Sequence, residues 1–200
     1  MKPTSTILAL GLMTALFLTA CSGEGNDVQD AGEIEDGSDG RDAGGGDDGE
    51  IVTGFKDLQN WSAYEPPIAD PTLNAKAKGY YGAVFDGRYI YYVPCRSGNR
   101  TTDFHGVVMR YDTQAAFATP EAWAFYDAGQ TLDDPARPTV GYAGGTFDGR
   151  FVYFVPYADG STRHARVLAY DTEGTGFLNA DSWSAFDAGE LSGMPANSGY

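Results

Sequence analysis

The stretch FDGRYIYYVP, residues 85–94, returns almost unchanged as FDGRFVYFVP at residues 147–156. A ten-residue segment that occurs twice in a chain of 200 residues indicates an internal repeat. Because repeat proteins form a small set of architectures, the length and content of the repeating unit decide the class of fold.

The agreement extends well beyond these two segments, and it defines a unit of about 60 residues with complete copies at 79–129 and 141–189. Four further pairs occur in the same order in both copies: Gly79-Tyr80 with Gly141-Tyr142, Tyr111-Asp112-Thr113 with Tyr170-Asp171-Thr172, Phe117 and Trp123 with Phe177 and Trp183, and FYDAG (125–129) with AFDAG (185–189).

Two partial copies flank the complete ones. Phe55 and Trp61 keep the six-residue spacing between Phe and Trp and lead into SAYE, so residues 51–66 are expected to form the lone last strand of a unit. Ser198-Gly199-Tyr200 is the expected start of a further repeat. Residues 51–200 together suit one domain.

Each unit is predicted to contain four strands. Asp-Gly between two apolar runs is a strong hairpin signal, and Asp-Thr after the third run favours a local turn. Thr119-Pro120 is typical of the start of a brief helical turn. In the first unit the strands are expected at residues 80–85, 88–93, 107–111 and 123–126, with the hairpin turn at Asp86-Gly87.

The second strand decides between architectures. Residues 89–93 (YIYYV) and 151–155 (FVYFV) do not alternate apolar with polar side chains, as a strand with one solvated face would. Both faces of this strand must be covered. A propeller packs every four-stranded sheet between two neighbours, whereas a sandwich leaves one face of each sheet in water. The sequence therefore predicts an all-β fold of antiparallel β-propeller blades.

The unit resembles a kelch-type propeller blade. FDGRYIYYVP, then VVMRYDT, then a Trp about a dozen residues later match the order of strand, Tyr-Asp-x-Thr and Trp in kelch repeats. Where kelch blades end the second strand with Gly-Gly, this chain has Val93-Pro94 and Val155-Pro156. A ring needs roughly four to eight blades. The ring is therefore expected to be incomplete, either because the chain is part of a longer protein or because several chains assemble.

Residues 1–20 are expected to be a lipoprotein signal peptide. Lys2 precedes an apolar run from Ile7 to Leu18, the order found in export signals. The run is shorter than the roughly 20 residues that cross a bilayer. An ordinary signal peptide that happens to contain a cysteine is the alternative.

The end of this segment, Leu18-Thr19-Ala20-Cys21, resembles the lipobox of bacterial lipoproteins. The resemblance implies that Cys21 becomes the mature N-terminus and carries acyl chains, including palmitate, which would make a lipid membrane a partner. Ser22 stands where inner-membrane retention uses Asp, so the outer membrane of a Gram-negative bacterium is favoured and the expected location is the cell envelope.

Residues 21–50 are expected to be a disordered tether. After Cys21 the segment has eleven acids against one base, many glycines and no aromatic residue. Such a composition cannot bury enough apolar surface to offset its ordering entropy. The alternative is a calcium loop at DGSDGRD (36–42), which lacks the acid spacing and the bidentate Glu of an EF-hand.

Composition and motifs exclude several functions. The net charge of −15 resides mostly in the tether, and no basic stripe suits a phosphate backbone, so nucleic acid is not an expected partner. No metalloprotease, thiol-redox or α/β-hydrolase motif occurs, and no metal or cofactor is expected. Cys95 is expected to be a structural or incidental thiol.

Residues that return in both units are expected to serve the blade itself rather than a ligand. His105 and His164 both precede the Tyr of YDT by six residues, which favours a role in the hydrogen bonding of the blade. Turn formation explains the three other recurring charged pairs without a catalytic role: Asp86 and Asp148, Arg88 and Arg150, and Asp112 and Asp171.

The segments that differ between units are the expected binding loops. CRSGNRTTDFH (95–105) corresponds to YADGSTRH (157–164), and the segments between units also differ. In propellers these two loop types emerge on the same face, where ligands commonly bind. The candidate ligand-binding residues are Arg100, Asp103, Asp133, Asp134, Arg137, Tyr157, Asp159 and Arg163.

Three functions remain open at this point. The favoured one is a non-enzymatic module that binds a protein or a glycan, since a fold alone specifies no reaction. A carbohydrate-active propeller is the second, and it would need a pair of carboxylates about 5 to 9 Å apart around a glycosidic bond. The third is a purely structural component of the envelope.

Overall fold

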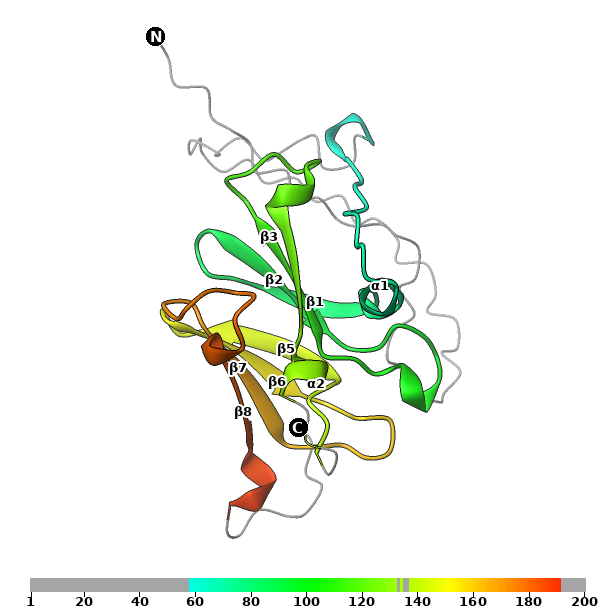
Figure 1. The fold of residues 1–200 in the computed structure, drawn as a ribbon, viewed down its shortest axis with the longest axis vertical. Coiled ribbons are helices and arrows are strands. Elements are labelled where there is room, and N and C mark those ends of the chain that lie inside the picture. The colour runs from blue at the N-terminus through cyan, green and yellow to red at the C-terminus, as the bar shows by residue number, and fades with distance from the viewer. Residues whose placement is uncertain (1–57, 133, 135–136, 192–200) are drawn as a thin grey trace, which may run out of the picture. The chain divides into compact units, whose positions relative to one another are not determined.

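The computed structural model describes residues 58–132, 134 and 137–191. They contain two four-stranded antiparallel sheets, each with its strands in chain order (Figure 1). The first sheet comprises β1 (Tyr80–Phe85), β2 (Tyr89–Pro94), β3 (Val107–Asp112) and β4 (Trp123–Asp127); the second comprises β5 (Tyr142–Phe147), β6 (Phe151–Pro156), β7 (Arg166–Asp171) and β8 (Trp183–Asp187). The predicted all-β class is confirmed, and each strand predicted in the first unit lies within one residue of its observed bounds.

The remaining elements are short. The chain divides into two compact regions, Met1–Ala63 and Tyr64–Tyr200, and both sheets belong to the second region. The signal peptide, Cys21, the tether, residues 51–57, Asp133 and residues 198–200 lie outside the described residues. The helical segment of the first region is η1 (Leu58–Asn60). Those of the second region are α1 (Pro71–Lys76), η2 (Thr101–Asp103), η3 (Pro120–Ala122), α2 (Ala128–Thr131), η4 (Ala180–Ser182) and η5 (Ala188–Glu190).

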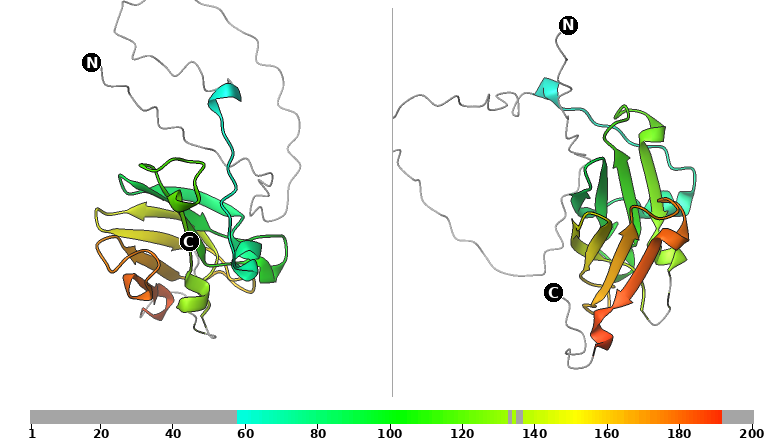
Figure 2. Two further views of the ribbon diagram at one scale, coloured as in Figure 1. Left: turned by 45° about the horizontal axis from the view of Figure 1, so that its top comes forward. Right: turned by 90° about the vertical axis from the view of Figure 1, so that its left-hand side faces the viewer.

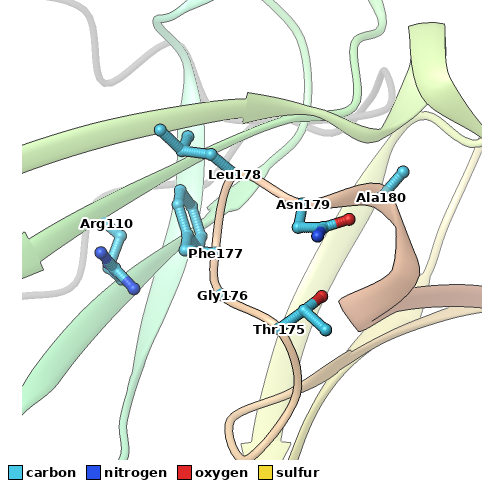
Figure 3. A pocket seen from close by; sticks show the side chains of 7 residues that line it. All are labelled: Arg110, Thr175, Gly176, Phe177, Leu178, Asn179 and Ala180. Atoms are coloured by element: carbon cyan, nitrogen blue, oxygen red, sulfur yellow. The ribbon is translucent and has the colours of Figure 1, made fainter.

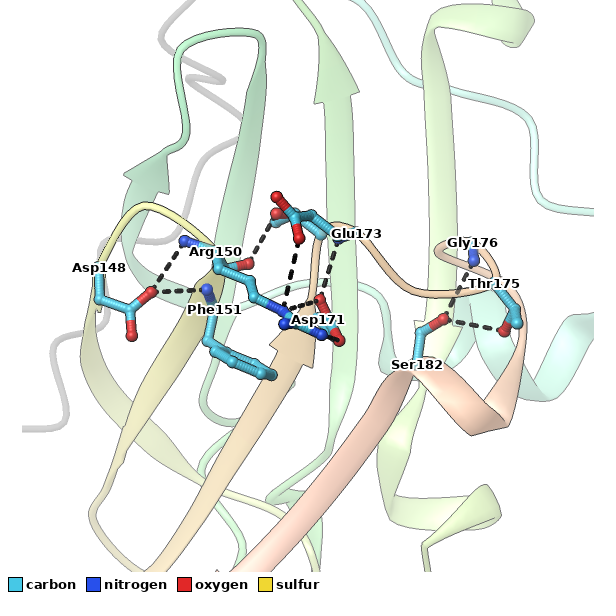
Figure 4. Close-up of polar contacts among 9 residues, drawn as sticks. Asp148, Arg150, Phe151, Asp171, Glu173, Thr175, Gly176 and Ser182 are labelled. Carbon is cyan, nitrogen blue, oxygen red and sulfur yellow. Dashed lines mark hydrogen bonds and ion pairs between the residues drawn. The ribbon is translucent and has the colours of Figure 1, made fainter.

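The predicted hairpin turns are built by their aspartates. In the second sheet the Oδ1 atom of Asp148 accepts hydrogen bonds from the backbone N–H groups of Arg150 (2.9 Å) and Phe151 (2.7 Å), as Figure 4 shows. Asp86 accepts the corresponding bonds in the first sheet. Gly149 follows with φ of 105°, a left-handed conformation that glycine adopts without strain. The recurring Asp-Gly pair is therefore a turn, as the sequence predicts.

The DGR and YDT motifs form the two halves of one clasp. The Arg150 guanidinium donates to both carboxylate oxygens of Asp171, at 3.1 and 2.7 Å (Figure 4), and the Thr172 hydroxyl donates to the Arg150 carbonyl at 2.6 Å. Arg88 and Asp112 repeat the bidentate pair in the first sheet. These hydrogen bonds lower the pKa of both aspartates, the Arg side chain being the main cause. The recurring charges thus join the second strand of each sheet to the third.

The six-residue spacing between Phe and Trp also has a local cause. The Trp183 indole N–H donates to the Phe177 carbonyl at 2.8 Å, and Trp123 donates to Phe117 at 2.9 Å. Each bond closes the loop that leads into the fourth strand. The expected helical turn at Thr119-Pro120 is present as η3, although the Thr119 hydroxyl donates to the Ala116 carbonyl and does not cap the helix.

The two sheets pack face to face and share one core. The Tyr91 ring of the first sheet lies 5.5 Å from the Tyr170 ring and 6.1 Å from the Phe177 ring of the second. Strand β1 runs beside β5, and the green and yellow-to-orange sheets lie side by side in both views of Figure 2. At this contact a Cβ atom on Gly145 would approach Val84 Cγ2 to 2.7 Å. The absence of a side chain at Gly145 is therefore what allows the strands to lie this close.

No strand forms in the described part of residues 51–66, which corrects that expectation. Residues 58–60 form η1 and residues 61–66 lie in no sheet. The physical reason is that a fourth strand pairs with a third strand, and in the described residues both third strands, β3 and β7, already pair with β4 and β8. Tyr64 nevertheless packs against the first sheet as its counterpart Tyr126 packs against the second, because the Tyr64 ring lies 6.2 Å from the Phe117 ring and 6.3 Å from the Trp123 ring.

One face of the second sheet is solvent-exposed although its counterpart is buried. Tyr126 is 5% exposed and Val93 is fully buried, because the second sheet covers both. Their counterparts in the second repeat, Phe186 and Val155, are 55% and 40% exposed. The first sheet packs against the second sheet through this apolar face. The equivalent apolar face of the second sheet is exposed to solvent.

Candidate functional site

Both histidines form hydrogen bonds within the framework of their own sheets. His105 is 1% exposed; its Nδ1 accepts from the Val107 N–H at 3.2 Å and its Nε2 donates to the Lys78 carbonyl at 2.7 Å. Burial lowers the pKa of His105 to about 4, so the ring is neutral at neutral pH. His164 makes the equivalent bonds to Arg166 N–H and the Val140 carbonyl. The expected structural role is confirmed.

The β2–β3 and β6–β7 loops meet at one end of the two sheets, which we call the loop end. A Cβ atom on Gly160 would come within 1.8 Å of the Thr101 carbonyl oxygen, so the two loops are in direct contact. The Phe104 and Tyr157 rings lie 6.4 Å apart. The Arg163 guanidinium lies over Tyr157 at 5.5 Å from its centroid. The structure thus brings Tyr157 and Arg163 of the β6–β7 loop together.

Three of the predicted ligand-binding residues line a cavity of about 370 Å³ at the loop end. Arg137 comes from the segment between the sheets, and Asp159 and Arg163 come from the β6–β7 loop. The β8 end closes the third side. The full lining, which we call the loop-end cavity, is Arg137, Pro138, Asp159, Thr162, Arg163, His164, Ala165, Arg166, Asp187, Gly189 and Glu190.

The other predicted residues do not join this lining. Asp103 accepts a hydrogen bond from the Arg100 N–H at 2.8 Å, so this carboxylate closes its own turn, and the Arg100 side chain lies outside the cavity. Asp134 contributes its carbonyl to a turn with the Arg137 N–H. Asp133 lies outside the described residues. Of the eight candidate residues, three therefore line this cavity, and the other residues of the lining were not among the candidates.

Sequence comparison missed Arg166, Asp187 and Glu190. Arg166 stands where the first unit has Val107, and this difference at the start of a strand was the available signal. Its Nε donates to the Thr139 hydroxyl at 2.9 Å and one Nη donates to the Leu132 carbonyl at 3.3 Å. Arg166 therefore ties β7 to the segment between the sheets while its charge borders the cavity.

The charges around the cavity are only partly paired. Arg137 forms an ion pair with Glu190. Among the described residues, no carboxylate lies within 4 Å of the guanidinium of Arg163 or Arg166. Among the described residues, the buried Tyr142 hydroxyl has no hydrogen-bond partner. Burial raises the pKa of Tyr142, and the nearby charge of Arg166 opposes this shift.

The equivalent position in the first sheet is occupied by an ion pair. Lys76, at the end of α1, donates to Asp127 at 3.1 Å. Asp127 corresponds to Asp187 in the repeat, while Pro138 stands in the place of Lys76. Among the described residues, Asp187 of the second sheet therefore lacks the cation that neutralises Asp127 in the first.

A second cavity, of about 580 Å³, lies at the opposite end of the strands, near the hairpin turns. It lies between Arg110 and the loop of residues 175–180 (Figure 3). The Arg110 guanidinium lies 4.2 Å from the Tyr89 centroid and 4.4 Å from the Phe177 centroid. Arg110 is therefore held between an aromatic ring of each sheet and joins the sheets.

No protein-family model and no curated protein matches this chain. In the part of the chain that the structure describes, no three His, Cys, Asp or Glu side chains are grouped to hold a metal ion. Within the same residues, no helix has the length and apolar character needed to cross a membrane. Cys95 is 2% exposed, and burial of this kind disfavours thiol reactivity.

Proposed function

We propose that the protein is a membrane-anchored binding module whose ligand site is the loop-end cavity. The observation that carries this proposal is that side chains from the β6–β7 loop, the segment between the sheets and the end of β8 converge on one cavity. Convergence of loops on a rigid scaffold is the usual construction of a binding site.

A binding role is favoured over glycoside hydrolysis or a purely structural role. Hydrolysis needs two carboxylates about 5 to 9 Å apart around the bond that breaks, one of them acting as a proton donor. Here Glu190 pairs with Arg137, and Asp159 and Asp187 each hold backbone N–H groups through Oδ1 and keep Oδ2 as a hydrogen-bond acceptor, an arrangement that suits binding of a ligand. A structural component has no need of arginines without carboxylate partners at an open cavity.

We propose further that the two sheets are blades of a kelch-like propeller. The exposed face with Val155 and Phe186 supports this arrangement, because the equivalent face of the first sheet is covered by a sheet of the same repeat. The contacts of the Tyr64 ring with Phe117 and Trp123 support it at the other side of the first sheet. A further sheet of this repeat is the surface that fits the exposed face.

The anchor is proposed from the sequence alone. A lipobox-like segment ending at Cys21, followed by an acidic, glycine-rich tether, would hold the module at a distance from the lipid surface in the envelope, with the outer membrane favoured.

The binding proposal is tested by exchanging loops. Residues 157–164 are replaced by residues 95–105, and the native and exchanged proteins are compared on an array of glycans and peptides. We expect the exchanged protein to keep its circular dichroism spectrum and thermal midpoint and to lose the probes that the native protein binds. Unchanged binding by a folded exchange variant would contradict a ligand site in the loop-end cavity.

A further inference from the structure

The loop-end cavity carries equal numbers of both charges. Three arginines, Arg137, Arg163 and Arg166, face three acids, Asp159, Asp187 and Glu190. A ligand with a net charge would be attracted by one set and repelled by the other. The lining therefore favours a ligand that offers hydrogen-bond donors and acceptors together and carries no net charge.

The charged side chains have unused hydrogen-bonding capacity. Asp187 accepts from the Gly189 N–H through Oδ1, and the bonds of Asp159 also use its Oδ1. Among the described residues neither Oδ2 accepts a hydrogen bond. Arg166 uses Nε and one of its two Nη atoms on neutral oxygens, which leaves donors on the other. Acceptors and donors therefore lie around the same cavity.

We propose that this cavity binds an uncharged saccharide; this inference rests on the binding function proposed above. A sugar hydroxyl donates and accepts at once, so neighbouring hydroxyls can donate to Asp187 or Asp159 and accept from Arg163 or Arg166.

Size and lining distinguish this ligand from a protein partner. A volume of about 370 Å³ lies within the range of small-ligand sites. The core of a protein interface is depleted of charged residues and rich in large apolar ones, whereas Pro138 and Ala165 are the apolar residues of this lining. An acidic peptide would have to approach Asp159, Asp187 and Glu190.

The first sheet provides an internal comparison. There Lys76 neutralises Asp127, and Val107 stands in the place of Arg166. The donors and acceptors that the proposal uses are therefore specific to the second sheet, and they are not a by-product of the repeat.

The experiment titrates the full-length chain with neutral pentasaccharides of glucose, mannose, xylose and N-acetylglucosamine, with pentagalacturonate and an acidic peptide as charged comparators. Calorimetry is performed at about 50 mM and about 500 mM NaCl, because salt screens charge–charge attraction. We expect at least one neutral saccharide to bind with an affinity that changes less than about twofold between the two salt concentrations.

Matched variants locate the site. Arg163→Gln and Asp187→Asn are each expected to weaken binding of that saccharide about tenfold, the effect of losing one charge-assisted hydrogen bond. Arg100→Gln, at a loop-end arginine outside the cavity, should bind as the native chain does.

Two outcomes overturn the inference. If only pentagalacturonate or the peptide binds, with an affinity that falls steeply with salt and depends on Arg163, the site exists but its ligand class is wrong. If none of these probes binds, or if both cavity variants bind as the native chain does, the assignment of a neutral saccharide to this cavity fails. The loop-exchange array decides separately whether the loop end binds any ligand.

Discussion

The Tyr126 ring of the first sheet stacks on the Trp183 ring of the second with centroids 4.5 Å apart and an interplanar angle of 5°. Tyr126 occupies the same place in its repeat as Tyr64 and Phe186. Tyr64 contacts Trp123 in the same order, while Phe186 is exposed. At Tyr64 and Tyr126 this aromatic position therefore contacts the Trp of the following unit.

The first prediction compares two members of this series. Tyr126→Ala should lower the free energy of unfolding by about 3 kcal/mol, because it removes a buried aromatic ring from the contact between sheets. Phe186→Ala should change it by less than about 1 kcal/mol, because its ring is largely in water. Urea denaturation followed by tryptophan fluorescence measures both values. Equal losses would show that the two positions are not the covered and uncovered versions of one face.

The second prediction concerns two adjacent glycines in β5. Gly145→Ala places a Cβ atom 2.7 Å from Val84 Cγ2 and 2.6 Å from the Tyr153 carbonyl oxygen, so overpacking should cost about 1 to 3 kcal/mol. Gly144→Ala is the control, since no heavy atom lies within 4 Å of its Cβ position, and it should be neutral or slightly stabilising. Thermal unfolding of the two variants provides the comparison. A tolerated Gly145→Ala would mean that β1 and β5 are farther apart than the structure has them.

The repeat explains which features could be predicted from the sequence. The strand bounds could be predicted because the same local sequence patterns occur in both units. The Asp-Gly turns could be predicted from the conformational preferences of those two residues. The Arg150–Asp171 clasp was not predicted, because its partners are 21 residues apart and meet only after β6 and β7 pair.

The candidate site was predicted less completely. Asp103 and Asp159 look alike in the sequence as loop acids, yet one closes a turn outside the cavity and the other closes a turn at its edge. Arg166 was not predicted because it is the first residue of β7, and only loop residues were compared between the two units. Register and loop conformation determine such differences, and both depend on tertiary contacts.

The third prediction tests the anchor. If Cys21 is acylated, cells that express the native chain should hold it in the membrane fraction, because two or three acyl chains give stable attachment. Cys21→Ser should release the protein into the soluble fraction, while Cys95→Ser, at the buried second cysteine, should leave it membrane-bound. Fractionation with metabolic labelling by palmitate measures both properties. Membrane retention of Cys21→Ser without label would contradict the anchor.

The fourth prediction follows from the neutral, buried His105. Its pKa is lowered from 6.5 to about 4 in the folded chain, with burial as the main cause. As pH falls, the imidazole is therefore protonated in the unfolded chain before it is protonated in the folded chain. The contribution of His105 to the free energy of unfolding is fully present above pH 6.5, and on the order of 3 kcal/mol is lost between pH 6.5 and 4. Denaturant titrations at a series of pH values measure this slope.

His105→Gln isolates this contribution, because Gln can still donate to the Lys78 carbonyl but does not titrate. The variant should be less stable than the native chain at pH 7 and should lose less stability between pH 6.5 and 4.5. The aspartates of the clasps, whose pKa values are lowered, contribute their own loss at more acidic pH in both proteins. Parallel pH profiles of the two proteins above pH 4.5 would show that His105 is not buried in its neutral form.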